Sequence, residues 1–157
     1  MNKIIHSVNL TKIYGEKETS VTALDDINVE FKENDFTAIM GPSGSGKSTL
    51  LHCLAGLDRP TSGQIYLREE DISTLNDKQL TKIRRDSFGF VFQAFNLIPT
   101  LTAEENITLP ASIAGRKPDM DWVKQVVDAV DIGDRLTHRP NELSGGQQQR
   151  VAAARAM

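Results

Sequence analysis

The chain has 157 residues, of which 39% are hydrophobic and 25% charged, and its formal net charge is −3. This profile predicts one soluble globular domain with a single core and excludes a disordered chain. A net charge of −3 provides no overall basic field, so no nucleic acid partner is expected.

Membrane insertion and disulfide bonding are not expected either. The N-terminus "MNKIIHSVNL" lacks the apolar run of a signal peptide, and no segment approaches the roughly 20 apolar residues that cross a bilayer. Cys53 is the only cysteine, which excludes an intrachain disulfide, and it lies in an apolar helical pattern that predicts a buried side chain. The sequence therefore favours a cytoplasmic protein, whose membrane role would come through a partner.

Three segments of the first half are typical of half-buried strands. Residues 4–14 and 22–31 mix apolar and polar side chains with a period close to two, and the turn-like "GEKETS" at 15–20 separates them. These two strands are expected to pair antiparallel. A further short strand is expected at residues 64–67.

A different pattern surrounds the first glycine-rich stretch. The short apolar run "FTAIM" at 36–40 does not alternate, which predicts a strand covered on both faces. The loop "GPSGSGKST" at 41–49 follows at once, and a helix is expected at about 47–55. The run "FGFVFQ" at 88–93 predicts a second buried strand, after a helix in "LNDKQLTKIRRD" at 75–86.

Helices dominate the predicted second half. Thr102 and Glu105 have capping-box spacing, so a helix is expected to begin there, within an irregular or small helical subdomain between Pro99 and Pro118. The segment 118–130 has an apolar stripe that predicts core packing. The stripe consists of Trp122, Val123, Val126, Val127 and Val130.

The first glycine loop satisfies the pattern G-x-x-x-x-G-K-[ST] between a predicted strand and a helix, which indicates a phosphate-binding loop. Glycines allow successive backbone N–H groups to turn toward an anion, and the helix start adds unpaired donors and a positive dipole end. Lys47 would reach the β- and γ-phosphates, the Ser48 hydroxyl would coordinate Mg²⁺, and Thr49 would reach the α-phosphate region. The alternative is a Gly/Ser-rich turn that caps an ordinary helix. The candidate nucleotide-binding residues here are Gly41, Pro42, Ser43, Gly44, Ser45, Gly46, Lys47, Ser48 and Thr49.

A second glycine pair occurs in "LSGGQQQR". Ser144 and Gln147 have S-x-x-Q spacing, which predicts a helix N-terminus, and Gly145 and Gly146 leave its N–H groups uncovered. One nucleotide does not need two such sites from one chain, but in a two-fold dimer each pair could close over the partner's phosphate loop. The alternative is a plain capped helix.

Together these motifs resemble the nucleotide-binding subunit of an ABC transporter. The resemblance rests on "GPSGSGKST" as the phosphate loop, "FQ" at Phe92 and Gln93 as the Q-loop, and "LSGGQQQR" as the signature, in that order. It covers essentially the whole chain and implies an α/β fold. The expected fold is a P-loop NTPase core with a mostly parallel sheet, an N-terminal antiparallel β edge and a small α-helical subdomain.

Details such as "HCLAGLDRPTSG" and "GFVFQAFNLIPTLTAEENITLP" further resemble the export ATPases for lipoprotein release, macrolide efflux and antimicrobial-peptide resistance. The resemblance implies a core at about 1–92 and 140–157, with the Q-loop and helical subdomain at about 93–139.

The resemblance also implies roles for individual residues. Tyr14 in "TKIYG" would stack on adenine, although an ordinary strand tyrosine is the alternative. Gln93 would bind Mg²⁺ or the attacking water, and with Lys47 it is the candidate catalytic residue of this chain. The signature residues would contact the γ-phosphate across the dimer; they are Ser144, Gly145, Gly146 and Gln147.

The family pattern continues with a Walker B strand, a catalytic Glu and a switch His, which no residue up to Met157 matches. Hydrolysis needs a positioned water and complete Mg²⁺ coordination, so this chain by itself is expected to be nearly inactive and its sheet incomplete. We interpret it as the N-terminal fragment of a longer ATPase domain.

The favoured function is the ATP-driven engine of a membrane exporter, with ATP and Mg²⁺ as cofactors. It would act as a dimer of ATPase subunits at the inner face of the cell membrane, bound to transmembrane permease subunits. Two alternatives remain open: a soluble ABC-type ATPase that acts in DNA repair or translation, and a regulatory nucleotide-binding module without turnover.

Overall fold

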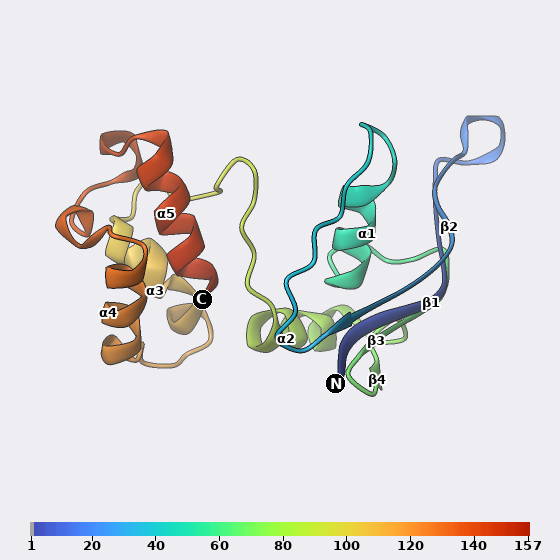
Figure 1. Ribbon diagram of the computed structural model, residues 1–157, viewed down its shortest axis with the longest axis horizontal. Helices are drawn as coiled ribbons and strands as arrows, with labels where there is room; N and C mark the ends of the chain where they lie inside the picture. The colour runs from blue at the N-terminus through green and yellow to red at the C-terminus, as the bar shows by residue number, and fades with distance from the viewer. Residues whose placement is uncertain (1) are drawn as a thin grey trace. The chain divides into compact units, whose positions relative to one another are not determined.

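The computed structural model describes residues 2–157, which divide into two compact units (Figure 1). One unit extends to Arg84, and the other runs from Arg85 to Met157. Each has a hydrophobic core of its own, so the expectation of a single core is wrong. Among residues 2–157, no helix combines the length and apolarity that crossing a bilayer requires.

The first unit is built on a four-stranded sheet in the order β2-β1-β3-β4, with every neighbouring pair antiparallel. On the central strand β1, Ser7 lies opposite Val29 of β2 and Ile65 of β3. The two strands that side-chain alternation predicts are confirmed, and so is the short strand expected at residues 64–67. In chain order the elements are β1 (Lys3–Tyr14), the 3-10 helix η1 (Lys17–Thr19), β2 (Val21–Lys32), β3 (Ser62–Leu67) and β4 (Glu70–Asp71).

Helix α1 (Lys47–Leu54) contacts β1 and β2, and its predicted position is confirmed. Cys53 on α1 is fully buried, as its apolar surroundings predict. Helix α2 (Asp77–Ser87) adds Leu80 to the same core, and the division between the units falls within this helix. The buried core residues are Leu10, Leu24, Cys53, Leu54, Ile65, Ile72 and Leu80.

The two strands predicted from short apolar runs, at residues 36–40 and 88–93, are not formed. Both segments run without regular secondary structure, and neither pairs with a strand of the described sheet. A strand exists through hydrogen bonds to a neighbour, so an apolar run that has no neighbour stays irregular. Phe36 is accordingly 99% exposed and Met40 is 87% exposed, where the prediction placed both in a buried strand.

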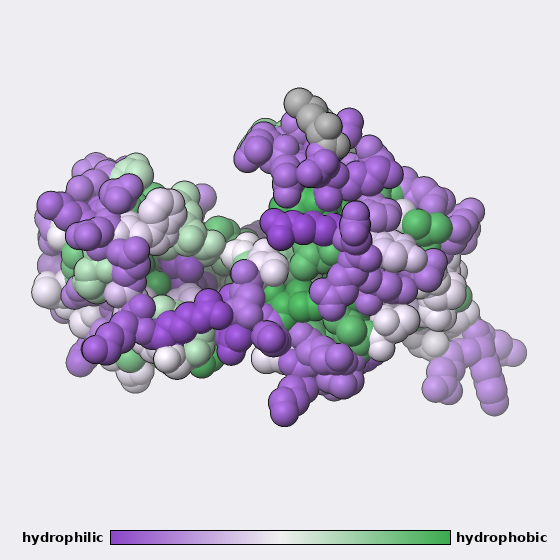
Figure 2. Space-filling model, turned by 90° about the horizontal axis from the view of Figure 1, so that it is seen from below, coloured by the Kyte–Doolittle hydropathy of each residue, from purple (hydrophilic) through white to green (hydrophobic). Residues whose placement is uncertain are grey.

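Apolar surface is visible on the first unit, in green between hydrophilic residues (Figure 2). A side chain as exposed as that of Phe36 forgoes about 1.5–3 kcal/mol of burial free energy. The segment that leads into the glycine loop therefore exposes two large apolar side chains, Phe36 and Met40.

The second unit consists of helices. Thr102 and Glu105 form the predicted capping box at the start of α3, and Asp119 caps α4 by accepting from the Asp121 and Trp122 N–H groups. The elements are α3 (Ala103–Ile113), α4 (Met120–Ala129), the 3-10 helices η2 (Gly133–Arg135) and η3 (Pro140–Glu142), and α5 (Gly145–Ala156). The buried core residues are Ala103, Ile107, Val126, Val127, Ile132, Leu143, Val151 and Ala154.

One buried polar side chain anchors the loop ahead of α3. Asn106 is fully buried, and its amide donates to the Ile98, Leu101 and Thr102 carbonyls while its oxygen accepts from the Ile98 N–H. Because these hydrogen bonds satisfy the amide, its burial is not penalised. The loop 98–102 is thereby fixed to α3.

The fold class is α/β, with the expected N-terminal antiparallel sheet and a helical part. The parallel strands of the expected core are not formed by residues 2–157, so the sheet is incomplete.

Candidate functional site

The glycine loop leads into α1 through a backbone conformation that only glycine fits. Gly46, the N-cap of α1, has a φ of +84°, and a Cβ atom there would lie 2.4 Å from the Ala23 carbonyl oxygen. The N-cap residue has no side chain to bond the first turn of α1. Because the helix dipole is positive at this end, the uncapped N–H groups of α1 favour an anion.

The Lys47 side chain folds back over the loop that precedes it. Its Nζ donates to the Gly41 carbonyl at 2.9 Å and to the Pro42 carbonyl at 2.6 Å, and lies 3.4 Å from Ser45 Oγ. These acceptors are neutral, and phosphate oxygens form stronger, charge-assisted hydrogen bonds with an ammonium. The structure thus places a positive charge directly at the loop, where it can exchange carbonyl partners for a phosphate.

The chemistry of Ser48 fits a magnesium ligand. Its side chain is exposed, and its hydroxyl has no hydrogen-bond partner among residues 2–157. Mg²⁺ prefers oxygen ligands and is usually held by one or two protein groups together with substrate phosphates and water. A free hydroxyl directly after the lysine of a phosphate loop meets this requirement.

Tyr14 lies at the end of β1, close to α1. Its hydroxyl donates to Asp58 Oδ2 at 2.5 Å, and the ring is 41% exposed. The hydrogen bond to Asp58 and burial raise the pKa of Tyr14, while the hydroxyl of Thr49 acts in the other direction. The structure therefore brings two predicted binding residues together, Tyr14 and Thr49.

Lys12 completes this cluster. Its Nζ lies 2.6 Å from Asp58 Oδ1, 2.7 Å from the Arg59 carbonyl oxygen and 4.7 Å from the centroid of the Tyr14 ring. Burial raises the pKa of Asp58, but the hydrogen bonds from Lys12 and Tyr14 outweigh it, and the pKa is lowered. Asp58 is therefore an ionised carboxylate at neutral pH. Sequence patterns missed Lys12 and Asp58, because no motif links residues so far apart in the chain.

The second glycine pair begins a self-capped helix. Ser144 Oγ accepts from the Gln147 N–H at 3.3 Å, and Gln147 Oε1 accepts from the Ser144 N–H at 2.8 Å, so the predicted capping box is present. Gly145 and Gly146 are exposed, and a Cβ atom at either position would meet nothing within 4 Å. This helix start is open to an approaching molecule at the glycines only.

Gln93 lies in a turn rather than at the end of a strand, because the strand predicted before it is not formed. The turn is closed by a hydrogen bond from the Phe95 N–H to the Phe92 carbonyl at 3.0 Å, and the Gln93 side chain is exposed. Arg155 of α5 donates to the Phe95 carbonyl at 2.7 Å and to the Asn96 carbonyl at 2.6 Å. Burial lowers the pKa of Arg155. The structure thus ties the end of α5 to the residues that follow Gln93.

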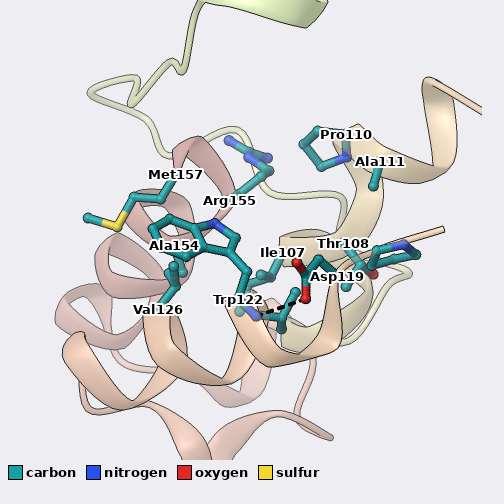
Figure 3. A pocket seen from close by; sticks show the side chains of 12 residues that line it. Ile107, Thr108, Pro110, Ala111, Asp119, Trp122, Val126, Ala154, Arg155 and Met157 are labelled. Carbon is teal, nitrogen blue, oxygen red and sulfur yellow. Dashed lines mark hydrogen bonds between the residues drawn. The ribbon is translucent and has the colours of Figure 1, made fainter. Parts of the chain in front are cut away.

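A pocket of about 190 Å³ opens on the second unit between α3, α4 and the end of α5 (Figure 3). The Trp122 ring, predicted to pack in the core, instead lines this pocket and is 50% exposed. The apolar stripe of α4 is wider than the core that it covers, so Val126 and Val127 are buried while Trp122 at its margin is not. Arg155 and Met157 also line the pocket.

In the part of the chain that the structure describes, neither the Cys53 thiol nor a cluster of metal-ligating side chains provides a second candidate site. Burial raises the pKa of the Cys53 thiol to about 11, so it is protonated and inert at neutral pH. Among residues 2–157, no three His, Cys, Asp or Glu side chains lie together as a metal site. The phosphate loop with Tyr14 is therefore the main candidate site of the first unit.

Comparison with known proteins agrees with this geometry. A family model described as "ABC transporter" matches residues 24–157. An uncharacterized ABC transporter ATP-binding protein of Thermotoga maritima is 49% identical and covers 100% of this chain, which spans 68% of that protein. The lipoprotein-releasing system ATP-binding protein LolD of Geobacter metallireducens is 46% identical, with 100% of this chain and 71% of that protein covered.

The chain spans a smaller part of larger relatives. The macrolide export ATP-binding/permease protein MacB of Brucella melitensis is 48% identical over 98% of this chain, which covers 24% of that protein. Among solved structures, the dimeric MJ0796 ABC transporter cassette of Methanocaldococcus jannaschii matches with a TM-score of 0.89 and 46% identity. That match covers 98% of this chain and 68% of the cassette. A second structure of the same cassette is described as bound to ADP and Pi.

Proposed function

The chain belongs to the ABC transporter family, and from this premise we propose that it couples ATP binding and hydrolysis to export through transmembrane subunits. The observation that carries the proposal is the uncapped start of α1 with the Lys47 ammonium held over the loop by neutral carbonyls. Such a site favours a polyanion, and the exposed Tyr14 ring close to Thr49 offers a surface for a base.

In the proposed ATP site, each part of the nucleotide is assigned to particular residues. Backbone N–H groups of residues 41–49 receive the phosphates, and Lys47 neutralises charge on the β- and γ-phosphates. Tyr14 stacks on the adenine. Ser48 and Gln93 are the proposed Mg²⁺ ligands; a bound Mg²⁺ would neutralise phosphate charge and help to orient the attacking water.

We propose that the signature residues act on a second copy of the ATPase subunit. Gly145 and Gly146 are exposed at the start of α5 with open space around them. These residues, with Ser144 and Gln147, would approach the γ-phosphate held by the partner's phosphate loop. The dimeric arrangement of the related MJ0796 cassette supports this proposal.

The proposed permease contact lies in the helical subdomain, at about residues 93–139. Support comes from the large apolar side chains within residues 93–139 that are at least half exposed, which are Ile113, Met120 and Trp122. The names of relatives from lipoprotein-releasing and macrolide export systems also favour a permease partner. The protein would then work at the cytoplasmic face of the membrane.

Residues 1–157 by themselves are proposed to bind ATP with little turnover. Lys47, Ser48 and Gln93 are present, but none of these residues is a carboxylate that could act as a general base. The catalytic glutamate of the family pattern has no match in this chain.

The experiment that tests the function is reconstitution of the full-length protein with candidate membrane partners in vesicles. We expect the partner to raise the ATPase rate and ATP to drive export. An ATPase that DNA or ribosomes stimulate, and that no membrane partner affects, would favour the soluble alternative and contradict the proposal.

A further inference from the structure

The structure assigns to Asp58 a positioning role: it holds the Tyr14 ring in one orientation beside the phosphate loop, together with Lys12, so that a purine base can stack on it. This inference rests on the proposed function, because it concerns the same nucleotide site. Asp58 itself would touch neither the base nor the phosphates.

The first argument is that Asp58 is itself fixed. Its backbone N–H donates to the His52 carbonyl at 3.2 Å, in the last turn of α1. Three residues later, Thr61 Oγ1 accepts from the Ile13 N–H at 2.9 Å, next to Tyr14 on β1. The Asp58 carboxylate therefore has a defined place between α1 and β1.

The second argument is that both carboxylate oxygens of Asp58 accept hydrogen bonds, one from Tyr14 itself and one from Lys12, which lies over the Tyr14 ring. Oδ2 accepts from the Tyr14 hydroxyl and Oδ1 accepts from Lys12 Nζ, which in turn lies over the Tyr14 ring. The side chains of Lys12 and Asp58 are only 13% and 29% exposed. A partly buried ion pair with hydrogen bonds at both ends orders its members better than a solvated surface pair does.

The third argument concerns the faces of the ring. Lys12 occupies one face by a cation–π contact, so a base has only the opposite face for stacking. Tyr14 is nevertheless 41% exposed, and without Asp58 its side chain would sample several rotamers. Binding would then have to order the ring, which lowers affinity for ligands that carry a base.

The test compares ATP with inorganic tripolyphosphate, which lacks a base, by calorimetry in the presence of Mg²⁺. In the full-length protein, Asp58→Ala is expected to weaken ATP binding about fivefold, the size expected when one side chain must be ordered on binding, and to leave tripolyphosphate binding unchanged. Asp58→Asn keeps an acceptor for the Tyr14 hydroxyl and should recover part of the loss. Glu30→Ala, which removes a carboxylate paired with Lys3 on the same sheet, is the matched control and should change neither affinity.

A Tyr14→Ala background separates positioning from a general structural effect. There, adding Asp58→Ala should cause no further loss of ATP affinity, because the ring that Asp58 positions is gone. Equal losses for ATP and tripolyphosphate, or a loss that persists without the Tyr14 ring, would overturn the inference while leaving the proposed function standing. Failure of the unmodified protein to bind either ligand would overturn the proposed function and this inference with it. If Asp58→Ala does not fold, the same comparison is made with Asp58→Asn.

Discussion

The two glycine-rich helix starts of this chain differ in how their first N–H groups are satisfied. At α1 the N-cap is Gly46, which has no side chain, and the nearby Lys47 charge is held only by neutral oxygens. At α5 the N-cap is Ser144, and a complete capping box satisfies the N–H groups of Ser144 and Gln147 but not those of Gly145 and Gly146. The start of α1 therefore has no side-chain cap, whereas the start of α5 is capped and has open space at its two glycines.

This difference indicates a division of labour. An uncapped helix start with a lysine above it can bind a phosphate group by itself. A capped start has fewer free donors, so it adds to a site that another surface has already built. We therefore expect substitutions near α1 to affect binding to the monomer, and substitutions near α5 to affect association.

Lys47→Ala should produce the largest effect. Removal of the ammonium from the phosphate loop is expected to weaken ATP binding by about 100-fold, in line with the loss of charge-assisted hydrogen bonds. Titration calorimetry measures it, with Lys124→Ala on the exposed side of α4 as the control. Unchanged affinity for ATP would contradict the assignment of the phosphate loop.

Ser144→Arg should distinguish the role of the α5 start from that of the α1 start. In the full-length protein it is expected to leave ATP binding to the monomer intact and to block ATP-driven dimerisation, because a bulky cation would replace the small cap at the proposed interface. Size-exclusion chromatography with light scattering in the presence of ATP reports the association. Dimerisation equal to that of the unmodified protein would remove the proposed cross-subunit role.

Gly46→Ala and Gly145→Ala form a matched pair for stability. At Gly46 the added methyl group meets the Ala23 carbonyl at a positive φ, which should cost about 1–3 kcal/mol of unfolding free energy. At Gly145 the methyl group enters open space in the first turn of a helix, so the change should be within about 0.5 kcal/mol. Urea denaturation measures both free energies. Equal losses for the two variants would contradict the conclusion that only Gly46 has a backbone conformation and surroundings that exclude a side chain.

The smallest effect concerns pH. The pKa of Asp58 is lower in the folded protein than its ordinary value of 3.8, so its stabilising contribution is present above that value and is lost as the pH falls through the folded pKa. The stability difference between the unmodified protein and Asp58→Asn, below about 1 kcal/mol for a partly exposed pair, should therefore shrink as the pH falls below about 4. The cap at Ser144 has no titratable group, so the cost of Ser144→Ala should be independent of pH. A difference for Asp58→Asn that stays constant down to pH 2 would contradict this account.

Local patterns predicted the structure best. Alternation along β1 and β2, the capping boxes at Thr102 and Ser144, and the burial of Cys53 depend on neighbouring residues, and all are confirmed. The conformation of the glycine loop also follows from its own residues. The ligands assigned to that loop, to Gln93 and to the signature residues remain predictions.

The wrong predictions share one cause. They depend on contacts with distant parts of the chain, which a local sequence pattern does not reveal. The runs at 36–40 and 88–93 have strand composition, but a strand also needs a neighbour to hydrogen-bond. Trp122 matches a helical stripe, yet its burial depends on how far the core extends beneath α4. For the same reason the ion pair between Lys12 and Asp58 could be found only in the folded chain.

Arg155 connects the last turn of α5 to the residues that follow Gln93. Helix α5 has 12 residues and is therefore about 18 Å long, with Ser144 before its first turn and Arg155 in its last. The guanidinium donates hydrogen bonds to the Phe95 and Asn96 carbonyls. Both of these residues have the left-handed backbone conformation, with φ of +58° and +48°. The turn that carries Gln93 therefore cannot shift relative to α5 without breaking these two hydrogen bonds, and this links it to the helix that begins at the second glycine pair.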